Sequence, residues 1–290
     1  MLIVGCGDVG RRLAHRAMGR GEPIEAIVRR PESAAALTEQ GLAAMALDLD
    51  GPVELTGHQA QQRHVFYLAP PPSDGVLDPR MGTFLDALPN LPGRRIVYIS
   101  TTGVYGDCAG AWVDETRPAA PQVDRARRRY AAEQRLQAWR AAGNGEIVIL
   151  RVAGIYGPGK LPLARLRQQV PMIAAADAPW TNRIHIDDLV AVLEAAMARG
   201  GDGEVYNVSD GRPGNMREYF DQVADLFQLP RAPVITLAEA GEALSAGMLS
   251  YLGESRRLDN RKMREQLGVE LRYPNLASGL RAVRAAEVGA

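Results

Sequence analysis

LIVGCGDVGRRLA, residues 2–14, is an apolar run that breaks at three glycines and then continues with the periodicity of a helix. Leu2–Val4 predicts a buried parallel strand, and the residues after it fit the spacing G-x-G-x-x-G. Glycine suits this turn because a side chain would keep a pyrophosphate away from the helix N-terminus. The context predicts a dinucleotide site, whereas the alternative is a turn that only packs a helix on a strand. The loop residues expected at the site are Gly5, Gly7, Asp8, Val9 and Gly10.

Strand and helix signals alternate through the first half of the chain. Further apolar runs predict short buried strands at 24–28, 44–47, 65–68, 96–100 and 147–152. Helical stretches lie between most of them, which is typical of an α/β fold with a Rossmann-type doubly wound parallel sheet. Ligands of such sheets bind at the carboxyl ends of the strands, so the residues after each strand are the candidates for a site.

The pattern changes after residue 159. The sequence predicts a short helix over 161–170, a strand at 183–186, a helix over 187–197 and a strand at 204–208 that returns to the main sheet. From residue 211 onward helices predominate, at 216–229, 260–267 and 276–286. We therefore expect a dinucleotide-binding domain from 1–160 and 184–209. A smaller, mostly helical substrate-binding lobe is expected from 161–183 and 210–290.

Composition restricts the class of partner. Lys and Arg together number 34, as do Asp and Glu, so no net charge draws the chain to nucleic acid or to a membrane. We expect a cytoplasmic protein with a small-molecule substrate, because no apolar stretch reaches the length of a membrane span. Cys6 and Cys108 lack metal-ligand spacing and are expected to be reduced thiols, with no metal site. Two long helices could pair in a homodimer or face water.

The ends of the second, third and fourth strands suggest which dinucleotide would bind. Arg29 and Arg30 stand where an NAD-selective fold carries an acid for the ribose hydroxyls, and paired guanidinium groups suit a 2′-phosphate. NADP is therefore favoured over NAD, although a solvated charge pair is the alternative. Asp48 could accept from the adenine amino group or cap a turn. Leu68 and Ala69 precede three prolines that would form a stiff wall beside the cofactor, or a rigid loop without a ligand.

The fifth strand ends in residues 100–107, STTGVYGD, where hydroxyl groups are followed by V-Y-G. Later segments add to the pattern, namely LRVAGIYGPG at 150–159, IHIDD at 184–188 and VYNV at 205–208. In order, these segments resemble the extended short-chain dehydrogenases, the NAD-dependent epimerase/dehydratase family. The resemblance implies hydride transfer between a nicotinamide and a small polar substrate, with nucleotide-linked sugars as one candidate class. The shorter first step of the glycine motif points to an atypical branch.

The resemblance fails at the catalytic pair. The family has a tyrosine, followed four residues later by a lysine, on the helix after V-Y-G. Aligning on Glu133 puts Arg125 at the tyrosine position and Arg129 at the lysine position. Arginine keeps its proton, so Arg125 cannot carry one, although Arg129 could still hold the nicotinamide ribose. Thr101 matches the hydroxyl that polarises the substrate oxygen.

Two tyrosines and one further hydroxyl complete the candidate site. Tyr130 or a bound water would move the proton, but Tyr130 points about 100° round the helix from Arg129, so a packing role is the alternative. Thr102, Tyr105 and Arg125 are expected to line the substrate pocket, with packing between sheet and helix as the alternative for Tyr105. His185 is expected to be a structural histidine that bonds to backbone.

Three functions follow from these residues. The first is an NADP-dependent oxidoreductase or epimerase, with Thr101, Tyr130 and Arg129 as the catalytic group. The second is a catalytically silent NADP-binding sensor or scaffold. The third is different chemistry on the same fold, in which Arg125 or Arg129 stabilises an oxyanion.

Overall fold

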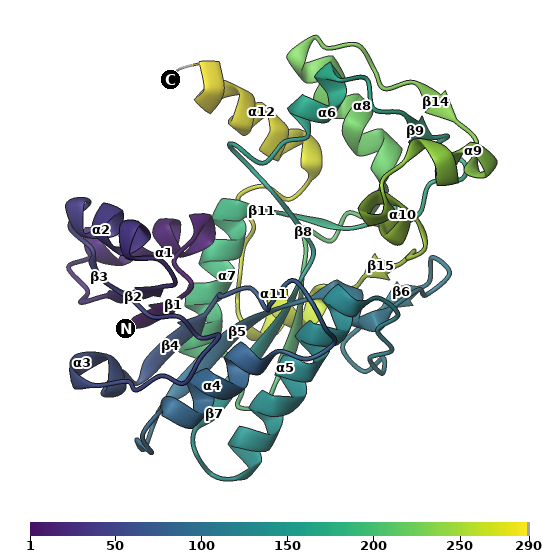
Figure 1. Ribbon diagram of the computed structural model, residues 1–290. Coiled ribbons are helices and arrows are strands. Elements are labelled where there is room, and N and C mark those ends of the chain that lie inside the picture. The colour runs from purple at the N-terminus through teal and green to yellow at the C-terminus, as the bar shows by residue number, and fades with distance from the viewer. Residues whose placement is uncertain (289–290) are drawn as a thin grey trace.

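A computed structural model describes residues 1–288 of the chain. Its centre is a seven-stranded parallel sheet with the order β12-β7-β5-β4-β1-β2-β3. Figure 1 shows this sheet with helices packed around it. The strands are β1 (Leu2–Val4), β2 (Glu25–Val28), β3 (Ala43–Ala46), β4 (His64–Tyr67), β5 (Arg95–Thr101), β7 (Glu146–Val152) and β12 (Val205–Val208). The predicted fold class is confirmed, and each of these strands lies within about two residues of its predicted position. The order reverses between β1 and β4, the point at which doubly wound sheets bind ligands.

Helices cover both faces of the sheet. One face packs on α1 (Asp8–Gly19), α2 (Pro31–Glu39), α7 (Ile186–Arg199) and α11 (Arg261–Gln266). The other packs on α3 (Gly57–Ala60), α4 (Pro79–Ala87) and α5 (Asp124–Ala141). The strands read as continuous apolar runs because both of their faces are buried. Cys6 and Cys108 are both free and buried, as expected of reduced thiols.

A second lobe stands over the carboxyl ends of the strands (Figure 1). It contains α6 (Leu163–Arg167), α8 (Met216–Phe227), α9 (Leu237–Ala243), α10 (Ala246–Leu252) and α12 (Leu276–Val288). Tyr156, Phe220 and Leu280 belong to its own apolar core. Helix α8 is fixed at its start by Asn215, whose side chain accepts from Glu218 N–H while Glu218 accepts from Asn215 N–H.

Short two-stranded sheets lie outside the main sheet. They pair β6 (Trp112–Val113) with β15 (Arg257–Leu258), β8 (Gly154–Tyr156) with β11 (Arg183–His185), β9 (Met172–Ile173) with β14 (Val234–Ile235), and β10 (Trp180–Thr181) with β13 (Gly214–Asn215). The predicted strand at 183–186 is therefore present but lies outside the main sheet. Helix α6 is shorter than predicted, and α9 and α10 have no counterpart among the predicted elements.

Helix α11 packs against the main sheet. Met263 and Leu267, in and just after α11, are fully buried in the apolar core of the main domain, although their sequence positions fall in the expected lobe. Within residues 1–288 no helix is both long enough and apolar enough to span a bilayer.

Candidate active site

The first of two large cavities has a volume of about 880 Å³ and lies at the ends of β1, β2 and β4. We call it the cofactor cavity. The lining includes these predicted cofactor residues: Gly5, Gly7, Arg29, Arg30, Asp48, Leu68 and Ala69. The predicted residues therefore come together from four separate segments within the first seventy positions.

The glycine loop shapes this cavity through its backbone. Gly5 has φ +88°, and a Cβ there would stand 2.5 Å from Ala69 Cα and closer still to the Ala69 nitrogen. Gly7 is the N-cap of α1, has no side chain to cap the helix, and would present an added Cβ to open space. The first amides of α1 are therefore available to an anion such as a pyrophosphate. These features fit a dinucleotide.

The other loop residues have different roles. Asp8 accepts from Arg12 and forms an ion pair with Lys160, whose Nζ lies 3.1 Å from Asp8 Oδ2. Val9 packs on the main apolar core. Gly10 allows α1 to approach β1, because a Cβ there would lie 3.2 Å from Ile3 Cγ2. All three are outside the lining of the cofactor cavity.

The far end of the cofactor cavity is rich in guanidinium groups. Arg29 and Arg30 are exposed beyond β2, and Arg11 also lines the cavity. The one glutamate in this lining is Glu32, on α2. Asp50 is paired with Arg80 at 2.5 Å and lies 3.7 Å from Arg29.

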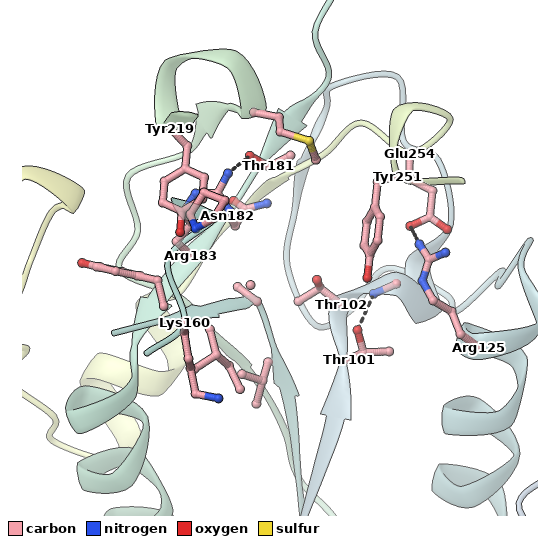
Figure 2. Close-up of a pocket in the computed structure, with 18 of the residues that line it drawn as sticks. Thr101, Thr102, Arg125, Lys160, Thr181, Asn182, Arg183, Tyr219, Tyr251 and Glu254 are labelled. Carbon is pink, nitrogen blue, oxygen red and sulfur yellow. Dashed lines mark hydrogen bonds and ion pairs between the residues drawn. The ribbon is translucent and has the colours of Figure 1, made fainter. Parts of the chain in front are cut away.

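The second cavity, about 850 Å³, lies between the ends of β5 and β7 and the second lobe. We call it the substrate cavity. Pro71 lines both cavities, so a ligand that extends along one can reach the other. Figure 2 shows Thr101, Thr102 and Arg125 on one side of it and Lys160, Asn182 and Arg183 on the other.

Thr101 stands at the end of β5 and is well placed to donate a hydrogen bond. Its Oγ1 accepts from Gly103 N–H at 3.2 Å, which fixes the side chain at the start of a 3-10 turn, Thr102–Tyr105. Because that oxygen acts as an acceptor in the turn, its own proton is available to a ligand in the cavity.

Arg125 and Arg129 both line the substrate cavity, one helical turn apart on α5. Arg129 donates to Ile99 O at 3.1 Å and to Ala69 O at 3.3 Å, so it ties the end of β5 to the wall of the cofactor cavity. Arg125 donates to Ser250 Oγ and lies 3.6 Å from Glu254. The arginines at these two positions therefore place two cations in the substrate cavity, with Arg129 next to the cofactor cavity.

Tyr130 and Tyr105 stand apart from the residues just described. Tyr130 is half-buried on α5 and is not part of the lining of the substrate cavity. Tyr105 is 1% exposed, and its hydroxyl donates to Asn207 Oδ1 at 2.8 Å. Burial raises the pKa of Tyr105 to about 12. Its position under the cavity corresponds to the packing alternative for this residue.

The floor of the substrate cavity is a buried ionic network. Arg151 on β7 donates to Glu133 on α5 at 2.8 Å, and both side chains are less than a tenth exposed. Ser100, which lines the cavity, donates to Glu133 at 2.5 Å. The guanidinium of Arg151 also lies 4.7 Å from the ring centre of Tyr105.

The wall formed by the second lobe brings in residues that sequence reasoning missed. Lys160, Arg183, Tyr219 and Tyr251 all line the cavity. Arg183 lies 3.8 Å from the ring centre of Tyr219, and burial lowers its pKa. The signal available for Lys160 and Arg183 was their position beside the YGPG and IHIDD segments. Tyr251 carried no signal, because α10 was not predicted.

The structural role predicted for His185 is confirmed. It is 1% exposed, and its Nδ1 accepts from Asp187 N–H at 3.2 Å at the start of α7. Burial lowers its pKa, which favours the neutral form that accepts this bond. Asp188 accepts from Arg272 N–H and Tyr273 N–H and so holds the segment before α12.

Comparison with known proteins gives consistent matches. Residues 1–209 match the model of the NAD dependent epimerase/dehydratase family. A solved structure from Silicibacter pomeroyi DSS, of unknown function, is 33% identical, with a TM-score of 0.86 over 99% of this chain and 98% of its own. UDP-glucose 4-epimerase from Thermotoga maritima, solved with UDP-glucose, has the same fold at 18% identity, with a TM-score of 0.79 over 99% of this chain and 98% of its own.

Protein YeeZ of Escherichia coli K12 is 26% identical over 186 residues, which is 62% of this chain and 59% of YeeZ. The chain therefore matches less than two thirds of the length of that relative. Taken with the match over residues 1–209, these comparisons do not favour the alternative of a catalytically silent module.

Proposed function

The chain belongs to the NAD-dependent epimerase/dehydratase family, and from this premise we propose that it is an oxidoreductase or epimerase that uses a nicotinamide dinucleotide on a small polar substrate. The observation that carries the proposal is the meeting of the two cavities at Pro71. One has the backbone cradle that a pyrophosphate needs, and the other has a hydroxyl donor and fixed cations. That the protein is cytoplasmic and that it forms a homodimer both remain predictions from the sequence.

The dinucleotide, when bound, supplies or accepts a hydride. The chain provides the remaining functions. Gly5 lets the loop pass close to Ala69, Gly7 leaves room for the pyrophosphate, and the free amides of α1 bind it. Arg129 fixes the boundary between the cavities and offers positive charge and donors to the nicotinamide ribose. Thr101 donates to the substrate oxygen and polarises it.

NADP is the favoured cofactor. Arg11, Arg29 and Arg30 all line the cofactor cavity, and Arg29 and Arg30, which follow β2, have exposed side chains that can reach a 2′-phosphate. Glu32 would favour NAD, but it is outnumbered by cations. Replacing Arg29 and Arg30 together by alanine should weaken NADPH binding by roughly tenfold or more and leave NADH binding within about threefold.

The substrate cavity is suited to an anion. Lys160, Arg165 and Arg183 line it together with the arginines already described, while Glu254 is the one carboxylate in that lining. A nucleotide sugar carries a diphosphate and a polar ring, and both suit a cavity with these donors. The solved epimerase with the same fold binds UDP-glucose, which supports the same substrate class here.

Two measurements test this function. Thermal unfolding with NADPH and with NADH should show a rise in Tm, larger for NADPH, because a ligand that binds only the native state stabilises it. No rise with either dinucleotide would refute the proposal. Turnover is then followed as interconversion of UDP-glucose and UDP-galactose, and as NADPH consumption with a panel of carbonyl compounds. A rise in Tm without turnover in either assay would favour the silent module instead.

A further inference from the structure

Few side chains in the substrate cavity can carry a proton to a substrate. Arg125 and Arg129 keep their protons in proteins. Tyr156 packs its buried hydroxyl against α12, and burial raises its pKa well above the usual range. Tyr219 is buried under the guanidinium of Arg183, and burial raises its pKa as well. These tyrosines therefore hold their protons away from a ligand.

Lys160 and Glu254 are engaged in ion pairs. Lys160 Nζ lies 3.1 Å from Asp8 Oδ2, on the side of the cavity that faces the glycine loop. Glu254 is 5% exposed and accepts from Arg256 at 2.8 Å, with Arg125 at 3.6 Å. Both charged groups are therefore directed at neighbouring side chains of the protein.

Tyr251 is different because its ring is accessible. It lies on α10, lines the substrate cavity and is 52% exposed. Figure 2 shows the ring standing next to Arg125, with the hydroxyl pointing toward Thr101 and Thr102, where β5 ends and the 3-10 turn begins. A substrate oxygen bound by Thr101 would thus face the Tyr251 hydroxyl from within the same cavity.

Arg125 holds this tyrosine in position. Its guanidinium lies 4.1 Å from the centre of the Tyr251 ring, within the range of a cation–π contact. Arg125 is itself fixed by Ser250 Oγ and by Glu254, which Arg256 anchors in turn. The arginine therefore contributes a fixed positive charge over the Tyr251 ring, which stabilises the negative charge that develops on the tyrosine during proton transfer.

We propose that Tyr251 is the proton carrier of the reaction, a catalytic residue supplied by α10 of the second lobe. The inference rests on the proposed function. In the reductive direction, the carbonyl carbon gains a hydride from the reduced dinucleotide and the carbonyl oxygen takes the Tyr251 hydroxyl proton. The products are the alcohol and the oxidised dinucleotide, and the tyrosyl oxygen regains a proton from water. Oxidation of an alcohol follows the same steps in reverse.

The variant Tyr251→Phe tests the proposal, since it keeps the ring and removes only the hydroxyl. We expect kcat for carbonyl reduction by NADPH to fall by about 10²- to 10⁴-fold, the usual contribution of a positioned acid or base. The Kd for NADPH, measured by titration, should stay within about twofold because the cofactor cavity is unchanged. Tyr273→Phe is the matched control, since this tyrosine is half-buried outside the cavity lining and contacts the ring of His185.

A binding measurement supplies a readout that needs no turnover. If the hydroxyl donates to the substrate oxygen, Tyr251→Phe should weaken UDP-glucose binding by several fold, while Tyr273→Phe should not. Retention of wild-type kcat and UDP-glucose affinity by Tyr251→Phe would overturn the inference. If Tyr130→Phe lowered kcat and Tyr251→Phe did not, the proton carrier would be Tyr130 on α5, and the inference would again be wrong. Failure of the wild type to bind any dinucleotide would instead refute the proposed function.

Discussion

The cofactor cavity and the substrate cavity meet at Pro71, yet different kinds of structure enclose them. The cofactor cavity is lined by residues 4–80, and its shape depends on glycines and strand ends that lie close together in sequence. The substrate cavity is lined by residues from 71 to 256 and depends on charged side chains from several elements. The shape of the cofactor cavity thus depends on local backbone geometry, whereas the shape of the substrate cavity depends on side chains that are far apart in sequence.

The difference also concerns how the two cavities are stabilised. Charged side chains that are less than a tenth exposed lie around or beneath the substrate cavity: Glu133, Arg151, Asp210, Glu254 and Arg256. Such groups stabilise a fold only while each keeps its partner, because removal of one leaves the other uncompensated in a medium of low polarity. The substrate cavity should therefore be the more sensitive of the two to loss of a charge.

The largest effect is expected for Arg151→Met. The substitution leaves Glu133 buried, with Ser100 as its remaining close donor, so the free energy of unfolding should fall by about 3–5 kcal/mol. Urea unfolding followed by circular dichroism measures the loss.

The double variant Arg151→Met with Glu133→Leu is the control for charge. Removing both partners should recover more than half of the loss, because no buried charge is left without a partner. A single variant within about 1 kcal/mol of the wild type would show that the ion pair does not stabilise this floor.

The pH dependence of stability should come in part from Asp210. This carboxyl group is 6% exposed, and burial raises its pKa from 3.8 to about 7. Its Oδ1 accepts from Arg212 N–H at 2.9 Å, and its Oδ2 has no partner among the described residues. Between about pH 4 and about pH 7 the folded state binds a proton that the unfolded state releases. The contribution of Asp210 to the free energy of unfolding is therefore greatest below pH 3.8 and falls as pH rises through about 7. The total fall is up to about 4 kcal/mol.

Asp210→Asn isolates this contribution from other carboxyl groups. The variant keeps an acceptor for Arg212 N–H and cannot ionise, so its stability relative to the wild type should increase between about pH 4.5 and about pH 8. Urea unfolding at several pH values gives the difference directly. A difference that does not change with pH would mean that Asp210 titrates near its ordinary pKa in the folded state.

The same contrast explains which parts of the molecule the sequence predicts. The seven strands of the sheet are short apolar runs bounded by turn residues, and the glycine loop acts within a few positions of β1. Arg29, Asp48 and Leu68 were found because parallel strands place their carboxyl ends at one edge. These inferences need only local pattern and a known connection rule.

The second lobe gave weaker signals for a physical reason. Helices α8 and α12 are long enough to be predicted, but α9 and α10 have seven residues each and hold their apolar residues against Ile173 and Leu244 instead of a long sheet face. Their hydrophobic periodicity extends over only two turns, which is too short to distinguish a helix from a loop. The position of Tyr251 beside Arg125 depends on how this lobe docks, and sequence spacing carries no information about docking.

The glycine loop offers the sharpest test of the cofactor cavity, because two of its glycines have different physical requirements. Gly5→Ala forces a side chain into φ +88° and against the Ala69 backbone, so β1 and β4 must separate at their ends. We expect a loss of about 2–3 kcal/mol in the free energy of unfolding. Gly7→Ala meets no atom of the protein within 4 Å and should change stability by less than about 1 kcal/mol.

NADPH affinity should be reduced in the variant that keeps its stability, Gly7→Ala. Gly7→Ala places a methyl group before the free amides of α1, so NADPH affinity should fall by roughly tenfold or more while the fold is retained. Urea unfolding and NADPH titration of both variants measure the two effects. If Gly7→Ala bound NADPH as the wild type does, the pyrophosphate would not lie on α1. The cofactor cavity would then be a close-packed turn between helix and strand, which is the alternative that the G-x-G-x-x-G spacing leaves open.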